Sequence, residues 1–148
     1  MKSQIKIGDN RLEMIRVFNA SRERVFEAWK QADQVQQWWG CEGTTRVESQ
    51  IDFRKGGSFT HKMYVTGCGE MSYTGIYDEI IEPEKIAWHV DFGGITGRVT
   101  VEFIAQGKQT KLTLTQEGFP GRDLCKIVSE GLTTAFDKLE QMLVGQVA

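Results

Sequence analysis

One change of hydrophobic period, from that of a strand to that of a helix, divides the first forty residues of the chain. Large apolar side chains alternate with polar ones over Leu12–Phe18, which predicts a strand that follows a polar tail. Ser21 then supplies an N-cap, and apolar residues recur at helical spacing over 25–29. A second short helix is predicted from near Asp33 toward Gly40, where the glycine ends it.

The middle of the chain has the period of two residues that is typical of strands. Turn sequences such as Gly56–Gly57 and Gly93–Gly94 separate the segments, and connections this short favour antiparallel neighbours. The six strands predicted here lie around Arg46–Glu48 and over Ser58–Val65, Met71–Ile81, Lys85–Phe92, Gly97–Ala105 and Gln109–Gln116.

A helical period returns after Gly121 and continues through the C-terminus, where apolar positions from Leu124 to Leu143 form one broad stripe. The opposite face is charged, so the stripe must cover apolar surface, and the only large candidate is one face of the predicted sheet. The pattern therefore predicts an α+β fold with about seven antiparallel strands curved around a long C-terminal helix. A length of 148 residues fits a single domain, with a core over residues 12–144.

Short motifs distributed along most of the chain add a family resemblance. They are Ala20–Trp29, Trp38–Gly40, Arg54–Phe59, Gly75–Ile80 with Pro83, Lys85–Trp88 and Gln109–Leu114. In this order they resemble the activator of heat-shock protein ATPase homologues, within the START-like SRPBCC superfamily. The resemblance implies a helix-grip fold with a cavity. It leaves the activity open, because such proteins include ligand binders, polyketide cyclase or aromatase relatives and chaperone-associated domains.

One position departs from the family pattern. Members often carry Gly-Trp within the final helix, whereas this chain has Gly131 followed by Leu132. The side chain at this position is therefore smaller than the indole of such members, and we expect the cavity to differ from theirs in volume or shape.

A physical argument also predicts a cavity. A sheet bent around a helix leaves a hollow wherever the concave side chains are too small to fill the space between them. Strand alternation and the helical stripe indicate which residues face that space. The predicted ligand-binding residues are Trp38, Trp39, Phe59, His61, Met63, Tyr73, Tyr77, Trp88, Leu132 and Phe136. The alternative interpretation is that these side chains simply form the core.

The polar members of this set carry the most specific hypotheses. His61, Tyr73 and Tyr77 could orient a ligand, or they could be satisfied internally as buried polar groups usually are. Trp38 and Trp39 point about 100° apart if both lie on a helix. We therefore expect one indole to pack in the core and the other to cap the cavity.

Composition and charge limit which classes of partner the protein is expected to bind. Eighteen Lys and Arg against twenty Asp and Glu give a net charge of -2, which argues against nucleic acid. The first residues have no apolar stretch behind their charges and no run of eighteen apolar residues occurs, so we expect neither export nor a membrane span. The three cysteines match no metal spacing and fit a cytoplasmic protein with reduced thiols. No motif indicates a cofactor or a metal.

Three function classes follow from these observations. The leading prediction is a noncatalytic protein that binds an apolar or lipid-like small molecule. The second is a protein-interaction module with a chaperone partner, as the resemblance implies. The third is a cyclase-like enzyme in which His61, Tyr73 or Glu102 would transfer protons, although strand alternation counts against Glu102. A homodimer is compatible with all three.

Overall fold

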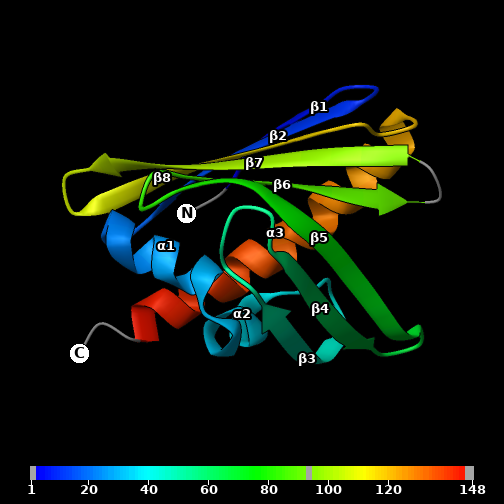
Figure 1. Ribbon diagram of the computed structural model, residues 1–148, viewed down its shortest axis with the longest axis horizontal. Coiled ribbons are helices and arrows are strands. Elements are labelled where there is room, and N and C mark those ends of the chain that lie inside the picture. Colours follow the sequence, from blue (N-terminus) through cyan, green and yellow to red (C-terminus); the bar gives the residue numbers. More distant parts are fainter. Residues whose placement is uncertain (1–2, 93–94, 146–148) are drawn as a thin grey trace.

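A computed structural model describes residues 3–92 and 95–145 of the chain, so the expected turn at Gly93–Gly94 lies outside the described residues. The described part is an antiparallel sheet of eight strands with three helices (Figure 1). The strands are β1 (Gln4–Ile7), β2 (Arg11–Phe18), β3 (Thr44–Ile51), β4 (Ser58–Val65), β5 (Gly69–Ile81), β6 (Lys85–Phe92), β7 (Ile95–Gln106) and β8 (Gln109–Glu117). The helices are α1 (Arg22–Lys30), α2 (Ala32–Trp38) and α3 (Arg122–Gly145).

The predicted α+β class and the order of its elements are confirmed, with one strand added. Gln4–Ile7 was expected to be a polar tail but forms β1, which pairs with β2 so that Ile5 lies opposite Met14. β1 is an edge strand whose side chains are mostly exposed. The alternation of buried and exposed positions that identifies a strand in a sequence is therefore absent from it.

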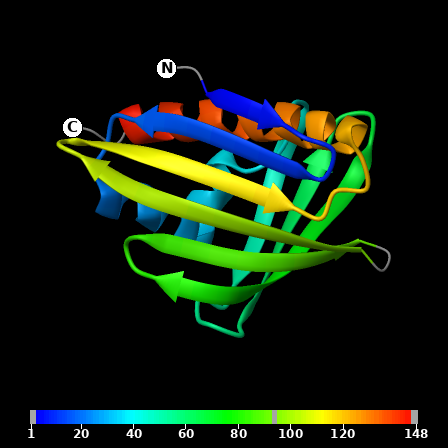
Figure 2. The same cartoon turned by 90° about the horizontal axis from the view of Figure 1, so that it is seen from above.

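The sheet has the order β1-β2-β8-β7-β6-β5-β4-β3. Consecutive strands from β3 to β8 are neighbours, whereas α1 and α2 carry the chain from β2 to β3 at the opposite edge. The sheet curves, and α3 lies along its concave side (Figures 1 and 2). A shift of register in β5 between Tyr77 and Glu79 marks a β-bulge, which bends a strand and increases its twist.

The two short helices are fixed by local hydrogen bonds. The Ser21 hydroxyl accepts a bond from the backbone N–H of Arg24 at 3.3 Å, as the N-cap prediction required. The Trp38 indole N–H donates to the carbonyl oxygen of Ala28 at 2.9 Å and joins α2 to α1. The helices therefore meet the sheet as one unit, with the Trp38 side chain fully buried.

The C-terminal half of α3 is packed closely against the sheet. Phe136, Leu139 and Leu143 are buried there, and the Phe136 ring meets the ring of Phe18 edge to face at 5.9 Å. Arg16 of β2, only 3% exposed, pairs with carboxylates of this half of the helix, Asp137 at 2.8 Å and Glu140 at 3.3 Å. Packing of these apolar side chains holds this half of the helix against the sheet, and the two carboxylates compensate the buried charge of Arg16.

Candidate ligand cavity

A cavity of about 420 Å³ lies between the N-terminal half of α3 and the concave face of β4 to β8. Its size is in the range of pockets that hold small molecules. The walls are the side chains and backbone of Trp39, Gly40, Cys41, Met63, Met71, Tyr73, Trp88, Gly97, Val99, Leu114, Gln116, Gly118, Phe119, Pro120, Leu124, Ile127, Val128, Gly131, Leu132 and Ala135. Most of these residues are apolar, so the cavity offers a hydrophobic surface.

Small residues on both sides explain why this end of the interior is hollow. Gly131 and Ala135 face the cavity from α3, and Gly97 faces it from β7. One turn further along the helix, Phe136 and Leu139 have large side chains that fill the corresponding space. The same helix therefore covers a cavity with its first half and a solid core with its second.

Exposed apolar side chains mark the opening of the cavity. Met71 of β5 is 46% exposed, Leu124 of α3 is 39% exposed and Ile127 of α3 is 64% exposed, and all three line the cavity. An apolar rim of this kind offers a hydrophobic molecule apolar contacts at the entrance to the interior.

The loop after α2 closes the other side. Trp39 is 9% exposed and lines the cavity, with its carbonyl oxygen accepting a bond from the Lys138 ammonium at 3.0 Å. Partial burial lowers the pKa of Lys138. This bond attaches the backbone of Trp39 to α3. The Trp39 indole is therefore held between the cavity and the aromatic core.

The polar groups of the walls are few and neutral. No Asp, Glu, Lys, Arg or His side chain is among the described residues that line the cavity. The Trp88 indole N–H donates to the Tyr73 hydroxyl at 3.0 Å, and burial raises the pKa of Tyr73 to about 12. Tyr73 therefore stays a neutral phenol at physiological pH, and Gln116 contributes an amide.

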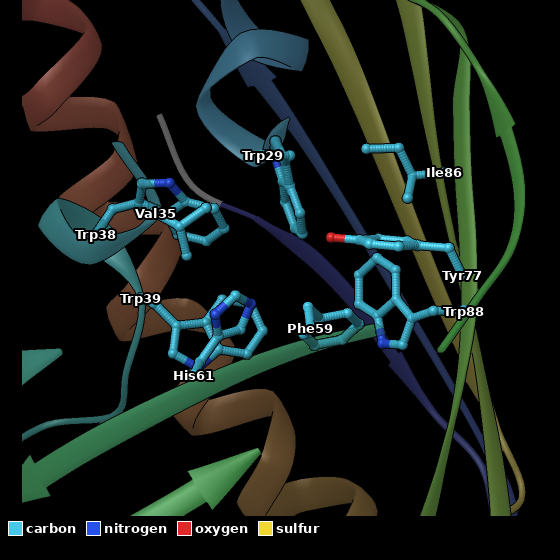
Figure 3. A pocket seen from close by; sticks show the side chains of 9 residues that line it. All are labelled: Trp29, Val35, Trp38, Trp39, Phe59, His61, Tyr77, Ile86 and Trp88. Atoms are coloured by element: carbon cyan, nitrogen blue, oxygen red, sulfur yellow. The ribbon is translucent and has the colours of Figure 1, made fainter. Parts of the chain in front are cut away.

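The structure places nine of the ten predicted ligand-binding residues around two separate spaces. Trp39, Met63, Tyr73, Trp88 and Leu132 line the cavity. Trp38, Phe59, His61 and Tyr77, together with Trp39 and Trp88, surround a space of only about 10 Å³ in the aromatic core (Figure 3). That space holds about one water molecule. Phe136 belongs to neither group and is fully buried in the core.

Figure 3 shows why the aromatic core is closed. Trp29 and Trp38 from the helices point toward Phe59, Tyr77 and Trp88 from the sheet. The Trp29 ring lies 4.6 Å from that of Trp38 and 6.1 Å from that of Trp88, and Phe59 lies 5.1 Å from Tyr77. Rings at these separations leave no room for a ligand.

His61 is satisfied inside this core. Its ring lies between those of Trp39 and Phe59, at centroid distances of 4.7 and 4.8 Å, and its Nδ1 lies 2.9 Å from the Ser49 hydroxyl. Burial lowers the pKa of His61 from 6.5 to about 3. The imidazole is therefore neutral at physiological pH and does not reach the cavity walls.

The buried neutral His61 predicts a pH-dependent stability. Between pH 6.5 and about pH 3 the unfolded chain binds a proton at His61 that the folded chain does not. The free energy of unfolding should therefore fall with decreasing pH, with His61 contributing up to about 1.4 kcal/mol per pH unit. Urea denaturation of a His61→Gln variant from about pH 7 to pH 4 should show a shallower fall than the wild type.

His89 supplies the matched control, because it is the only other histidine of the chain and its side chain is more exposed. A His89→Gln variant measured in parallel controls for the loss of a histidine that lies outside the aromatic core. Equal slopes for His61→Gln and the wild type would mean that the His61 ring is charged or solvated in the folded protein.

The groups proposed for proton transfer do not come together. His61 is in the aromatic core. Tyr73 lines the cavity, and its hydroxyl accepts a hydrogen bond from the Trp88 indole. Glu102 is exposed, on the face opposite the buried Val101 and Phe103. The other histidine, His89, lies outside the cavity wall and contacts the Asp78 carboxylate at 2.8 Å. Over residues 3–92 and 95–145 no group of His, Cys, Asp and Glu side chains could hold a metal ion.

Sequence reasoning missed most of the cavity wall, because only five of its 20 lining residues were among the predicted ligand-binding residues. Gln116, Phe119, Leu124, Ile127 and Val128 were not singled out as ligand-binding residues. Leu124, Ile127 and Val128 belong to the predicted helical stripe, which could have pointed to them. Gln116 shares the alternation of the buried Leu112 and Leu114, and a polar residue at an inward position is itself a signal of a site.

Comparison with known proteins decides the family. The model of the activator of Hsp90 ATPase homolog 1-like proteins matches residues 19–144. The chain belongs to this family. The match covers α1 through most of α3, so both the cavity and the aromatic core lie within it. A comparison with curated protein sequences gave no significant match.

Solved structures show the same helix-grip architecture. A protein from Nitrosomonas europaea is 18% identical, with a TM-score of 0.82 over 93% of this chain and 96% of the other. One from Rhodobacter sphaeroides is 20% identical, with a TM-score of 0.81 over 98% and 99%. One from Rhizobium leguminosarum is 25% identical, with a TM-score of 0.75 over 97% and 99%. The family and the fold that the motifs suggested are thereby confirmed.

Among the described residues, none of the helices combines the length and the apolar composition needed to cross a bilayer. All three cysteines, Cys41, Cys68 and Cys125, are free thiols.

Proposed function

We propose that this member of the activator of Hsp90 ATPase homolog 1-like family is a noncatalytic binding protein for a small apolar molecule, held between the sheet and α3. The observation that supports the proposal is the 420 Å³ hollow with apolar walls and an exposed apolar rim. A purely structural interior would bury these side chains against one another, as the aromatic core and the second half of α3 do.

The walls also indicate an affinity. A ligand that loses about 300 Å² of apolar surface to the cavity gains about 7 kcal/mol at about 25 cal/mol per Å². Loss of translational and rotational freedom offsets part of this gain and leaves binding in the micromolar range. Such a protein would act as a carrier or sensor in the cytoplasm, where its free thiols stay reduced.

The other predicted classes gain less support. The family name associates relatives with a chaperone ATPase, but no feature of the described surface selects a chaperone or a second copy of the chain as partner. A cyclase would need converging proton donors and acceptors at the cavity, and His61 and Glu102 are directed elsewhere.

A binding experiment tests the proposal. Phenylnaphthylamine, a neutral dye that fluoresces in apolar surroundings, should bind the purified protein with micromolar affinity, and small apolar molecules should displace it. The same molecules should raise the melting temperature, because they bind only the folded state. Native mass spectrometry of protein taken from its own host should show a reproducible added mass.

The proposal would be wrong if three results coincided. These are a bare mass in native spectra, no dye binding, and no change of melting temperature across a varied set of hydrophobic compounds. Together they would favour a protein-interaction role on the exposed rim of Met71, Leu124 and Ile127.

A further inference from the structure

Gln116 is a buried amide on an otherwise apolar wall. It lies near the end of β8, opposite Val99 of β7, and lines the cavity while being 7% exposed. Its Nε2 lies 3.8 Å from the point that a Cβ on Gly97 would occupy, so the amide is next to the side-chain-free backbone of β7. No described residue forms a hydrogen bond with the Gln116 side chain.

An amide in this position has an energetic consequence. Buried polar groups are normally paired with protein or with water. The Gln116 amide is not among the described side-chain atoms that are fully shut off from solvent without a partner, so a ligand that displaces water from it must supply a hydrogen bond in exchange. Tyr73 and Trp88 on the same wall follow the rule, since the indole N–H donates to the phenol oxygen at 3.0 Å. Gln116 has both a carbonyl oxygen and an NH₂ directed to a space that a ligand would fill.

The absence of charged side chains from the described cavity wall limits the charge that a ligand can have. A carboxylate or phosphate inside the cavity would lose its hydration without a cationic partner, because no Lys, Arg or His is among the described wall residues. A neutral hydroxyl, carbonyl or amide can instead exchange hydrogen bonds with Gln116. Tyr73, Trp88 and Phe119 add aromatic surface around the rest of the molecule.

We propose that the cavity selects a neutral, largely apolar ligand with one hydrogen-bonding group, which Gln116 recognises, and that it rejects the corresponding anion. The inference rests on the proposed binding function and names the ligand class for the same site. A carrier of free fatty acids or aromatic acids is thereby excluded, whereas an alcohol, ketone, amide or phenol fits.

Three naphthalenes of similar shape separate the possibilities. Naphthol offers a neutral hydroxyl, methylnaphthalene replaces it with a methyl group, and naphthoate carries a negative charge at neutral pH. Each is used to displace phenylnaphthylamine from the wild type and from Gln116→Met, which keeps the length of the side chain without its polar atoms. Gln116→Leu is measured in parallel, and circular dichroism with thermal melting checks that both variants fold.

In the wild type, naphthol should displace the dye and naphthoate should fail to do so at the same concentrations. Gln116→Met should weaken naphthol binding by about tenfold and leave methylnaphthalene binding unchanged or tighter, because one hydrogen bond has been removed. A fold-change specific to the hydroxyl compound is a readout that a general loss of packing would not produce.

Other outcomes would overturn the inference. Equal effects of the two variants on naphthol and methylnaphthalene would show that Gln116 does not recognise the hydroxyl group. Naphthoate binding as tight as naphthol binding would show that the cavity does not discriminate against anions. In both cases the proposed binding function would stand, whereas failure of every compound to bind the wild type would remove the function and the inference together.

Discussion

A Leu132→Trp variant should lose ligand binding while it stays folded. Leu132 lines the cavity from α3, and an indole is much larger than the leucine side chain that it would replace. A larger ring would occupy space that the ligand needs, and forcing both into the cavity costs about 1–3 kcal/mol. Dye affinity should therefore fall by at least about tenfold, and the melting temperature should stay the same or rise because a hollow has been filled.

Val144→Trp is the matched control on the same helix. Val144 is 56% exposed near the end of α3 and does not line the cavity, so the variant should bind dye like the wild type. Unchanged affinity in Leu132→Trp would show that the dye binds elsewhere on the protein. A large loss of stability would show that the cavity is closed in solution and has no room for the indole.

A Phe136→Ala variant should lose much more stability than Leu132→Ala, although the two residues are one helical turn apart. Phe136 is fully buried and packs against Phe18, so its truncation leaves a void in a dense core and should cost about 3–5 kcal/mol. Leu132 is only partly buried beside an existing hollow, so its truncation should cost about 1 kcal/mol.

Denaturation in urea measures both free energies of unfolding, and the dye titration adds an independent readout. Both variants should still bind the dye. Phe136→Ala should do so with wild-type affinity as long as it is folded, because Phe136 does not line the cavity. Equal losses of stability in the two variants would contradict the division of α3 into a half over a cavity and a half over a core.

The sequence was most informative about the elements themselves. Alternation of period two identified the strands from β4 to β8 to within a few residues, because each has one face against the interior and one against solvent. Ser21 and the apolar spacing after it located α1 for the same kind of local reason. The sequence did not predict β1, because an exposed edge strand has no buried face and therefore no alternation of apolar and polar residues.

The candidate site could be predicted only in part. Periodicity places Phe59, His61, Met63 and Tyr73 on the inner face of the sheet, and all four do face inward. It does not say what stands opposite each of them. His61 meets Trp39 and is enclosed, whereas Tyr73 and Met63 reach the hollow beside α3.

Periodicity, capping and turn residues by themselves determined the class of fold, the order of its elements and the side of each element that faces inward. These properties depend on a few neighbouring residues, whose spacing sets which side chains share a face. Only the tertiary structure decided that one half of α3 covers a solid aromatic and aliphatic core and the other a hollow next to Gln116. That division depends on the volumes of side chains far apart in the chain, such as Gly97 and Gly131, which meet only after the sheet has curved around the helix.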